Sequence, residues 1–393
     1  MKLINQNDYT RDESQGLKII GKKNTVIHCH HYNSRLQRTI EGNTKINGKK
    51  IFTKCAAISF YELIENLKEE KNCTNDLQII TDLYSFIGFG TINLSFFDQN
   101  KINCGNSHFV EGWKCGSIKT EGPVCRLTEG YLEGAIKSVT GRNVSIKETK
   151  CMNQGHHQCE FEIENLEQPK YNFQLEKFKD FSFKQNSLSP EATSNIDKKA
   201  IVNAVMNMPI EGNNEGLIPA FNVYLAHMPQ DFYNLVSIEF VNEMSKIGLA
   251  EIAQEMLIED AENCALNTFG GIWDSEEWAG LIAPMIKEEK DTIFGLVAVA
   301  NALGWGKINI LEHTSFETLT LESSNGYEAH GYIEHSGHSV TPQCFMLQGI
   351  TAGLMELVYE KGDLEDRSGK YQSEEITCLT KKDKSCLFTA KIK

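Results

Sequence analysis

The sequence predicts an α+β fold made of two duplicated domains, and a repeated motif carries most of this prediction. The spacing Pro-x-Cys-x4-Gly-x3-Gly occurs at residues 123–134 and again at residues 342–353. Each copy is followed by the spacing Glu-x2-Cys-x7-Cys, at residues 148–159 and 375–386. A chain of 393 residues is long enough for two domains that each bury a core. We therefore expect one structural unit made twice and packed as a pseudo-dimer.

Composition divides the chain into four parts. Residues 1–20 carry little pattern, and we expect them to form a loosely attached N-terminal arm. Residues 166–200 have mixed charge, few aliphatic side chains and a Ser-Leu-Ser-Pro stretch, which is typical of a linker. The first domain is then predicted at residues 21–165 and the second at residues 201–393.

Apolar periodicity predicts the elements of the first domain. Apolar side chains three and four residues apart indicate helices at residues 32–41, 51–68 and 76–86. Short β-branched and aromatic stretches indicate strands at residues 24–31, 91–97, 101–104 and 143–148. Pro123 favours a further helix start, because a missing N–H costs little in the first turn, and this helix is expected to end near Thr140. Gly130 and Gly134 lie one turn apart on it, so another backbone can approach that face.

The second domain repeats this order. We expect a strand at residues 221–227, followed by helices at residues 232–240, 252–266 and 292–303. The next segment, Gly-Trp-Gly-Lys-Ile-Asn-Ile at residues 304–310, is the counterpart of Gly-Phe-Gly-Thr-Ile-Asn-Leu at residues 88–94. Each domain is therefore expected to combine an antiparallel sheet with packed helices.

The overall charge argues against some classes of partner. The net charge of −14 opposes binding to phosphate backbones, which requires a basic face, so nucleic acid is not an expected partner. No N-terminal apolar run has signal-peptide length, and no segment approaches the roughly 18 apolar residues of a spanning helix. We expect a cytoplasmic protein that does not bind membranes. In such a chain, cysteines at repeated spacing favour metal ligation over disulfides.

Three cysteines and one glutamate recur at matching positions of the two copies. They are Cys125, Glu148, Cys151 and Cys159 in the first copy and Cys344, Glu375, Cys378 and Cys386 in the second. Zinc prefers four ligands drawn from thiolate, imidazole and carboxylate, and four protein ligands leave no open position, as in structural sites. We expect one zinc ion per copy, which pins the C-terminal loop of the domain to its helix. The alternative is a set of buried core cysteines without metal.

A run of histidines distinguishes the first half. His28, His30 and His31 flank Cys29, whereas the second half offers only His227 at the comparable place. On a strand, His28 and His30 would share one face. Together with a distant carboxylate they could hold a redox metal with open coordination positions. The alternative is that the three histidines are surface or packing residues.

The motif at residues 122–134, with the segments at residues 147–151 and 155–159, closely resembles the vinyl-4-reductase domain, also called the 4-vinyl reductase domain. It is most similar to the ligand-sensing domain of bacterial regulators that respond to phenols and other aromatic effectors. The resemblance implies that the three cysteines and the glutamate bind a structural zinc beside a buried, largely apolar effector pocket, and that the domain dimerises. It covers residues 72–164 well, and the second copy at residues 290–393 keeps the ligand spacing.

The chain also departs from those regulators. It carries no Walker motif and no basic region, so we expect neither their ATPase nor their DNA-binding activity. The family name refers to a proposed reductase role, but no dinucleotide fingerprint is present in this sequence. A reductase would therefore need an outside electron donor.

The resemblance also implies where a pocket lies. In the family the pocket is lined from the strand that precedes the Pro-x-Cys helix, which corresponds to residues 106–113 and 325–332 here. The expected pocket residues are therefore His108, Trp113, Tyr327 and Tyr332. An aromatic wall with one polar atom suits a small aromatic or amphipathic ligand. The alternative is that these four are ordinary core aromatics.

Two functions follow from these patterns. The first is a zinc-containing protein that binds a small hydrophobic or aromatic molecule, acts as a sensor or regulator, and passes its state to a protein partner, with homodimerisation as a further option. The second is a metal-dependent, oxidoreductase-like enzyme on a small hydrophobic substrate, which uses His28, His30 or His31. The residue types favour binding over catalysis and do not identify the ligand.

Overall fold

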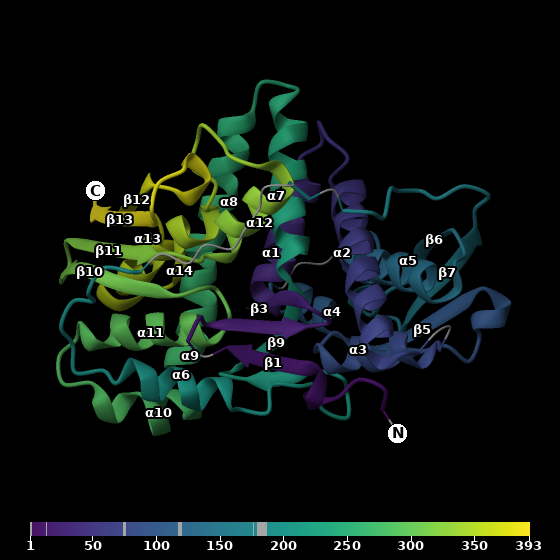
Figure 1. The fold of residues 1–393 in the computed structure, drawn as a ribbon, viewed down its shortest axis with the longest axis horizontal. Coiled ribbons are helices and arrows are strands. Elements are labelled where there is room, and N and C mark those ends of the chain that lie inside the picture. The colour runs from purple at the N-terminus through teal and green to yellow at the C-terminus, as the bar shows by residue number, and fades with distance from the viewer. Residues whose placement is uncertain (1, 13, 74–75, 117–119, 176, 179–186) are drawn as a thin grey trace.

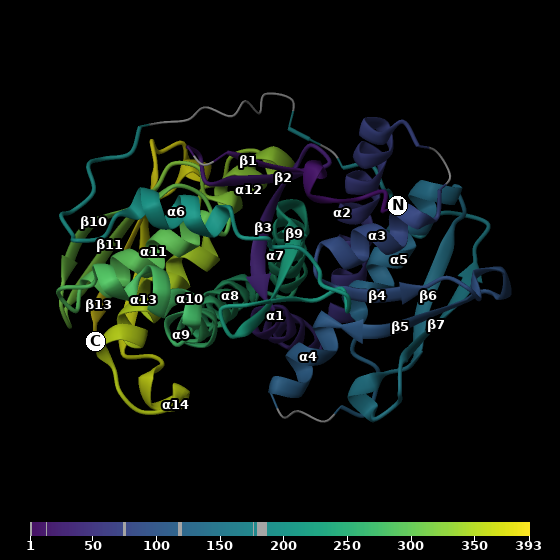
Figure 2. The same cartoon turned by 90° about the horizontal axis from the view of Figure 1, so that it is seen from below.

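The computed structural model describes residues 2–12, 14–73, 76–116, 120–175, 177–178 and 187–393. Within these residues the strands form three sheets, and two of them lie at opposite ends of the molecule with the third between them (Figures 1 and 2). Long helices pack between the central sheet and each outer sheet. The predicted α+β class with antiparallel sheets is confirmed.

The first half contains the following elements. Its strands are β1 (Tyr9–Asp12), β2 (Leu17–Ile20), β3 (Lys23–Cys29), β4 (Gly90–Asn93), β5 (Lys101–Ser107), β6 (Val144–Lys150) and β7 (Cys159–Asn165). Its helices are α1 (His30–Gly42), α2 (Gly48–Lys71), α3 (Gln78–Phe86), α4 (His108–Cys115) and α5 (Arg126–Thr140). Short 3-10 turns are η1 (Gln6–Asp8), η2 (Phe97–Gln99) and η3 (Met152–Gln154).

The second half follows in the same order. Its strands are β8 (Ile218–Ala220), β9 (Val223–Pro229), β10 (Ile308–Thr314), β11 (Thr318–Ser323), β12 (Tyr371–Thr377) and β13 (Cys386–Ile392). Its helices are α6 (Lys198–Met206), α7 (Gln230–Ser245), α8 (Ala250–Cys264), α9 (Gly270–Trp273), α10 (Glu276–Leu281), α11 (Asp291–Ala302), α12 (Tyr327–Ser336), α13 (Phe345–Tyr359) and α14 (Leu364–Arg367). A π-helical turn, η4 (Ala265–Phe269), and 3-10 turns η5 (Ala283–Met285) and η6 (Leu379–Lys381) complete it.

The two outer sheets have the same topology. The first has the order β4-β5-β7-β6 and the second the order β10-β11-β13-β12, and all neighbouring strands are antiparallel. The register of each sheet shifts at the same place, between Glu148 and Lys150 in β6 and between Glu375 and Thr377 in β12. Each irregularity turns the chain just before the second cysteine of the motif, as the spacing of the ligands requires.

The central sheet joins the two halves through an antiparallel pair of strands, β3 and β9. Superposing Lys23–Cys29 on Val223–Pro229 makes Ile27 and His227 equivalent, and these two residues lie opposite each other. On either side, equivalent residues exchange partners, because Val26 pairs with Met228 and His28 pairs with Ala226. This is the register that two copies related by a twofold rotation would have.

Each central strand is also bound to the opposite half. The Ile27 N–H donates to the carbonyl of Leu303 at 2.9 Å, and the His227 N–H donates to the carbonyl of Ile87 at the same distance. Ile87 and Leu303 directly precede the two equivalent Gly-aromatic-Gly segments. These reciprocal contacts support the pseudo-dimer arrangement, which stays a prediction.

Glycines set the spacing of the main helix pairs, as expected for residues 130 and 134. A Cβ built on Gly134 of α5 would lie 2.2 Å from the carbonyl oxygen of Ala57 in α2. In the second half, a Cβ on Gly349 of α13 would lie 2.2 Å from the carbonyl oxygen of Ile258 in α8. The two helices of each pair therefore approach to a distance that only glycine allows.

The expectation of a loosely attached N-terminal arm is wrong. Within residues 1–20, β1 and β2 pair with each other and extend the central sheet, and Ile4 is fully buried. The short apolar runs of these strands gain stability only from β3, a tertiary contact that local pattern does not reveal. Of the predicted linker at 166–200, residues 176 and 179–186 lie outside the described part. No helix in the described residues is both long and apolar enough to cross a lipid bilayer.

The helix spacing gives a test of the fold. Replacing Gly134→Ala should lower the free energy of unfolding by about 1–3 kcal/mol, because the added methyl group forces α5 away from the Ala57 carbonyl. Gly42→Ala is the matched control, since a Cβ there meets nothing within 4 Å. Urea unfolding of both variants measures the difference. Equal stability of the two variants would contradict the close α2–α5 contact.

The centre of the β3–β9 pair gives a pH-dependent test. Burial lowers the pKa of His227 to about 3, whereas an unfolded histidine titrates near about 6.5. Between these values the unfolded chain binds more protons, so this group makes the unfolding free energy fall as the pH drops from about 6.5 toward 3, by up to about 1.4 kcal/mol per pH unit. His227→Gln, which can still donate to the Ile210 carbonyl, should flatten that slope relative to wild type. The same substitution at the exposed His156 should leave the slope unchanged.

Candidate functional site

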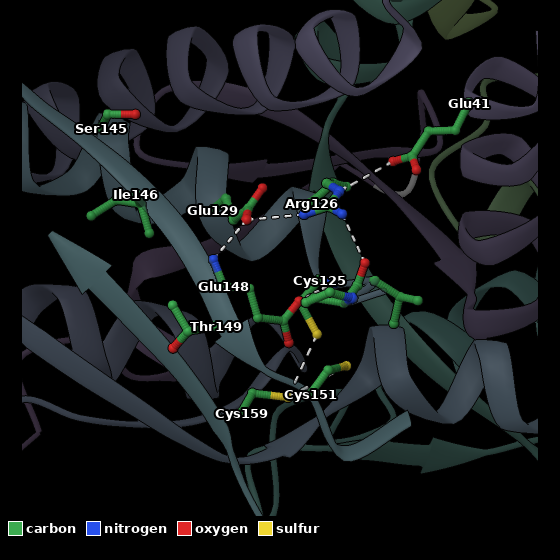
Figure 3. Close-up of polar contacts among 12 residues, drawn as sticks. Glu41, Cys125, Arg126, Glu129, Ser145, Ile146, Glu148, Thr149, Cys151 and Cys159 are labelled. Carbon is green, nitrogen blue, oxygen red and sulfur yellow. Dashed lines mark hydrogen bonds and ion pairs between the residues drawn. The ribbon is translucent and has the colours of Figure 1, made fainter. Parts of the chain in front are cut away.

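The first cysteine-glutamate group lies where α5 meets the strands of the outer sheet (Figure 3). Cys125 precedes α5, Glu148 lies in β6, Cys151 follows β6 and Cys159 begins β7. Each of the four residues offers a ligand atom within 4.8 Å of the others, and all four are buried. The Sγ atom of Cys159 lies 3.8 Å from that of Cys125 and 4.0 Å from that of Cys151. The sequence prediction of this group is therefore matched by the geometry.

The second group repeats this arrangement around α13, β12 and β13. Its four residues, Cys344, Glu375, Cys378 and Cys386, are buried, and their ligand atoms also lie within 4.8 Å of one another. The three pairs of sulfur atoms are 3.7 to 3.9 Å apart. The two groups can each hold one metal ion.

The sulfur distances distinguish metal ligands from disulfides. A disulfide requires about 2.05 Å between sulfurs, and all the cysteines of both groups are free. Four ligands in a tetrahedron with metal–sulfur bonds of about 2.3 Å have sulfurs about 3.8 Å apart, which is close to the spacing in both groups. The thiols are therefore already placed for a tetrahedral ion.

The glutamate of each group presents one oxygen to the sulfurs. Glu148 Oε2 accepts the Cys125 N–H at 2.7 Å, and Glu375 Oε2 accepts the Cys344 N–H at 3.1 Å. The other oxygen, Oε1, is buried in both residues and has no hydrogen-bond partner among the described residues. A buried carboxylate oxygen without a partner is costly, and a cation at the centre of the group would satisfy it.

The electrostatics of the groups also require a cation. Burial raises the pKa of Glu148 to about 8 and that of Glu375 to about 9. Three thiols and a carboxyl group packed together in the interior would therefore remain largely protonated by themselves. A divalent ion would stabilise their charged forms, and four protein ligands would close its coordination shell.

A salt-bridge network holds the first group in place (Figure 3). Glu129 on α5 accepts the Glu148 N–H at 2.8 Å and a hydrogen bond from Arg126 at 3.0 Å. The Arg126 guanidinium also reaches the Pro123 carbonyl and lies 3.6 Å from Glu41. These contacts tie the start of α5 to β6, so the two sides of the ligand group are positioned together.

A second feature is an aromatic cluster around His28, which lies between the two halves. The His28 ring stacks on Tyr32 with centroids 4.6 Å apart and on Trp305 with centroids 4.7 Å apart. Tyr233 and Tyr327 contact it edge-on, at 4.6 and 6.1 Å. The side chain is 1% exposed, and neither ring nitrogen has a hydrogen-bond partner among the described residues. Burial lowers the pKa of His28 to about 3, so its imidazole is neutral near pH 7.

The expected pocket residues lie on helices rather than on strands. His108 and Trp113 belong to α4, and Tyr327 and Tyr332 belong to α12, so the sequence placed these segments in the wrong type of element. Each segment continues directly from a strand of the outer sheet or the short turn after it, and the helix begins where the chain bends back over the core. Apolar and aromatic residues in a segment this short do not distinguish the two periods.

The structure places these four residues in two different environments. Tyr327 and Tyr332 line a tight cavity of ≈ 10 Å³ with Tyr32 and Tyr233, next to the His28 cluster. His108 is buried and bonded to Asn33, with 2.9 Å between His108 Nε2 and Asn33 Nδ2.

Trp113 lies apart from that cavity. It is largely buried, and the Arg38 guanidinium lies over its ring, 5.8 Å from the centroid. The binding role of all four predicted pocket residues stays a prediction.

The histidine run does not lie on one strand. Strand β3 ends at Cys29, and His30 begins α1, so the expectation that His28 and His30 share a strand face is wrong. The Cys29 side chain caps the helix by accepting the Tyr32 N–H, which a strand pattern does not reveal. Ligand atoms of His30 and His31 lie within 4.8 Å of Cys115, whereas His28 is in the aromatic cluster.

Several residues of these sites were missed from the sequence. Cys115 was interpreted as a buried hydrophobic residue, but it is exposed at the end of α4. Its position seven residues after His108 contains no signal for a ligand. Trp305 was identified as the counterpart of Phe89, and only the tertiary structure brings it to His28.

The fold and the two ligand groups define an α+β protein that can bind a metal ion in each of two similar units. Residues 102–165 match the family model of the vinyl-4-reductase domain, so this part of the chain is a domain of that family. The chain is also similar to the crystal structure of the phenol-responsive sensory domain of the transcription activator PoxR with phenol. That similarity has 15% identity and a TM-score of 0.36 and covers 42% of this chain and 88% of the PoxR chain. No curated protein matches the sequence.

The ligand groups give a direct test. Cys125→Ala should release one equivalent of metal per chain and lower the melting temperature, because a structural ion contributes its binding free energy to folding. Cys151→Ala should behave in the same way. Cys73→Ala, at a half-buried cysteine outside both groups, is the control and should retain the full metal content. Elemental analysis and thermal unfolding measure both effects, and unchanged metal content in Cys125→Ala would refute the site.

Proposed function

We propose that this chain is a zinc-containing small-molecule-binding protein that acts as a sensor or regulator. The family match of residues 102–165 and the two cysteine-glutamate groups support the proposal. Zinc is the proposed ion because three thiolates and one carboxylate in a closed tetrahedral set suit it, and both ions would then be structural. We propose a cytoplasmic protein, with a protein partner or a second copy that receives its signal.

The observation that carries the proposed ligand site is the unpartnered imidazole of His28. It lies within four aromatic rings, and neither of its nitrogens is satisfied by the described residues. A ligand with a flat apolar body and one polar atom would stack in this cluster and form the missing hydrogen bond. The proposed ligand is therefore a small aromatic or amphipathic molecule with a hydroxyl or similar group.

The cavity beside this cluster is small, which bears on how a ligand would enter. At ≈ 10 Å³ it has room for about one water molecule. Among its aromatic wall residues Tyr327 is buried, whereas Tyr332 is half-buried on the outer side of α12. We propose that movement of Tyr332 opens the cavity when the ligand binds.

A short path connects the proposed pocket with the second metal group. Glu328, next to Tyr327, accepts the N–H groups of Met346 and Leu347 at 2.9 and 3.2 Å. These amides belong to the first turn of α13, directly after the metal-ligand residue Cys344. A displacement of α12 by a ligand would therefore be transmitted to a helix that the metal holds in place, as a sensor requires.

Binding of phenol and toluene tests the proposal, because the two molecules differ in one hydroxyl group. Phenol should bind wild-type protein about tenfold more tightly than toluene, since a hydrogen bond to His28 contributes about 1.5 kcal/mol. His28→Phe should abolish that difference, and His156→Phe in an exposed loop should retain it. Isothermal titration calorimetry measures the affinities.

Native mass spectrometry of protein purified from its own host complements the titration. It should show two zinc ions and a retained small molecule on each chain. Absence of any retained molecule, together with equal or undetectable binding of the two probes, would contradict the proposed pocket.

A further inference from the structure

We propose that His30, His31 and Cys115 form a third metal site, open to solvent, which binds a divalent transition-metal ion such as zinc. One ligand atom from each residue lies within 4.8 Å of the other two. His30 Nε2 is 3.2 Å from Cys115 Sγ, and the two imidazole rings have their centroids 4.0 Å apart. These are short separations for side chains that come from different helices.

Two helix ends are held together to build this site. His30 and His31 begin α1, and Cys115 is the last residue of α4. Gly112 allows the contact, because a Cβ there would lie 2.4 Å from the His30 carbonyl oxygen. Ser34 Oγ donates to the Gly112 carbonyl at 3.1 Å and fixes the two helices relative to each other. The three side chains are therefore positioned by packing and not by a flexible loop.

The backbone of β9 orients His30 for metal binding. His30 Nδ1 lies 3.1 Å from the N–H nitrogen and 3.3 Å from the carbonyl oxygen of Tyr224. In one tautomer Nδ1 accepts the Tyr224 N–H, and Nε2–H donates to Cys115. In the other, Nδ1–H donates to the Tyr224 carbonyl, and the Nε2 lone pair faces the thiol. A metal ion selects the second tautomer, since metal-bound histidines commonly donate their other N–H to a carbonyl.

The open side of this group distinguishes it from the two closed cysteine-glutamate groups. His31 and Cys115 line both of two neighbouring cavities, of ≈ 480 and ≈ 660 Å³, and His30 also lines the smaller one. Glu276 and Glu277 line the smaller cavity and favour a cation there. The larger cavity carries Arg35 and Arg38 as well as Glu259, so the acidic cavity is the favoured route of entry.

The ligand types indicate which ions fit. Two imidazoles and one thiolate suit zinc and its first-row neighbours, and three protein ligands leave a fourth position for water or an exogenous ligand. On binding, the Cys115 thiol loses its proton to solvent and the sulfur forms a bond to the ion. No oxidation or reduction takes place in this step.

The site belongs to the first half alone. His30 and His31 directly follow β3, and the residues that directly follow the equivalent strand β9 are Gln230 and Asp231. Asp231 is instead bonded to Lys23 and His335, each 2.8 to 2.9 Å away. The third ion would therefore give the two duplicated halves different chemistry.

Cobalt binding to the full chain, with both closed groups already filled with zinc, tests the site. Wild-type protein should take up one further equivalent of Co²⁺ and develop a thiolate-to-cobalt charge-transfer band. Cys115→Ser should remove this band and weaken the binding at least about tenfold. Cys73→Ser, at another cysteine outside the ligand groups, should leave both unchanged.

A second variant covers the histidine side of the site. His31→Ala should weaken cobalt binding to a similar extent while the band position changes, because one nitrogen ligand is lost. The melting temperature and a zinc content of two per chain verify that each variant is folded. The proposal is overturned if wild-type protein binds no third ion, or if Cys115→Ser keeps the charge-transfer band.

Discussion

The antiparallel pair of β3 and β9 is the contact on which the rest of this structure depends. It is centred on Ile27 and His227, and each of these residues also donates its N–H to the opposite half. Because the hydrogen bonds are reciprocal, neither half can complete its central strand without the other. The same pairing carries His28 to Trp305 and His30 to the backbone of Tyr224. Both candidate binding features outside the closed metal groups are therefore built across the junction of the two halves.

The two closed groups and the open group illustrate how ligand number separates roles. In the closed groups a backbone N–H and three sulfurs surround one carboxylate oxygen that has no other described partner. An ion there would be fully coordinated and would join a helix start to two strands, which is a contribution to stability. At His30, His31 and Cys115 the ligands number three and the surroundings are cavities, which is the arrangement of an exchangeable ion.

The duplication makes the differences between the halves informative. The topology, the register irregularities and the glycine contacts are the same in both outer units. The central residues differ, since His28 corresponds to Met228 and Tyr32 to Phe232 in the superposed strands and following helices. Polar atoms were thus retained or gained on one side of the junction, where an unpaired buried imidazole is costly unless a ligand or water uses it.

The sequence by itself determined the α+β class, the duplication and all eight ligands of the closed groups. It could do so because fixed spacings occur twice, and because local periodicity specifies the long helices α2, α5, α8 and α13. Tertiary structure alone decided the attachment of residues 1–20, the helical start at His30, and the meeting of His28 with Trp305 and of His30 with Cys115. These features arise from pairing and packing between segments far apart in the chain, whose energies no local pattern of residues records.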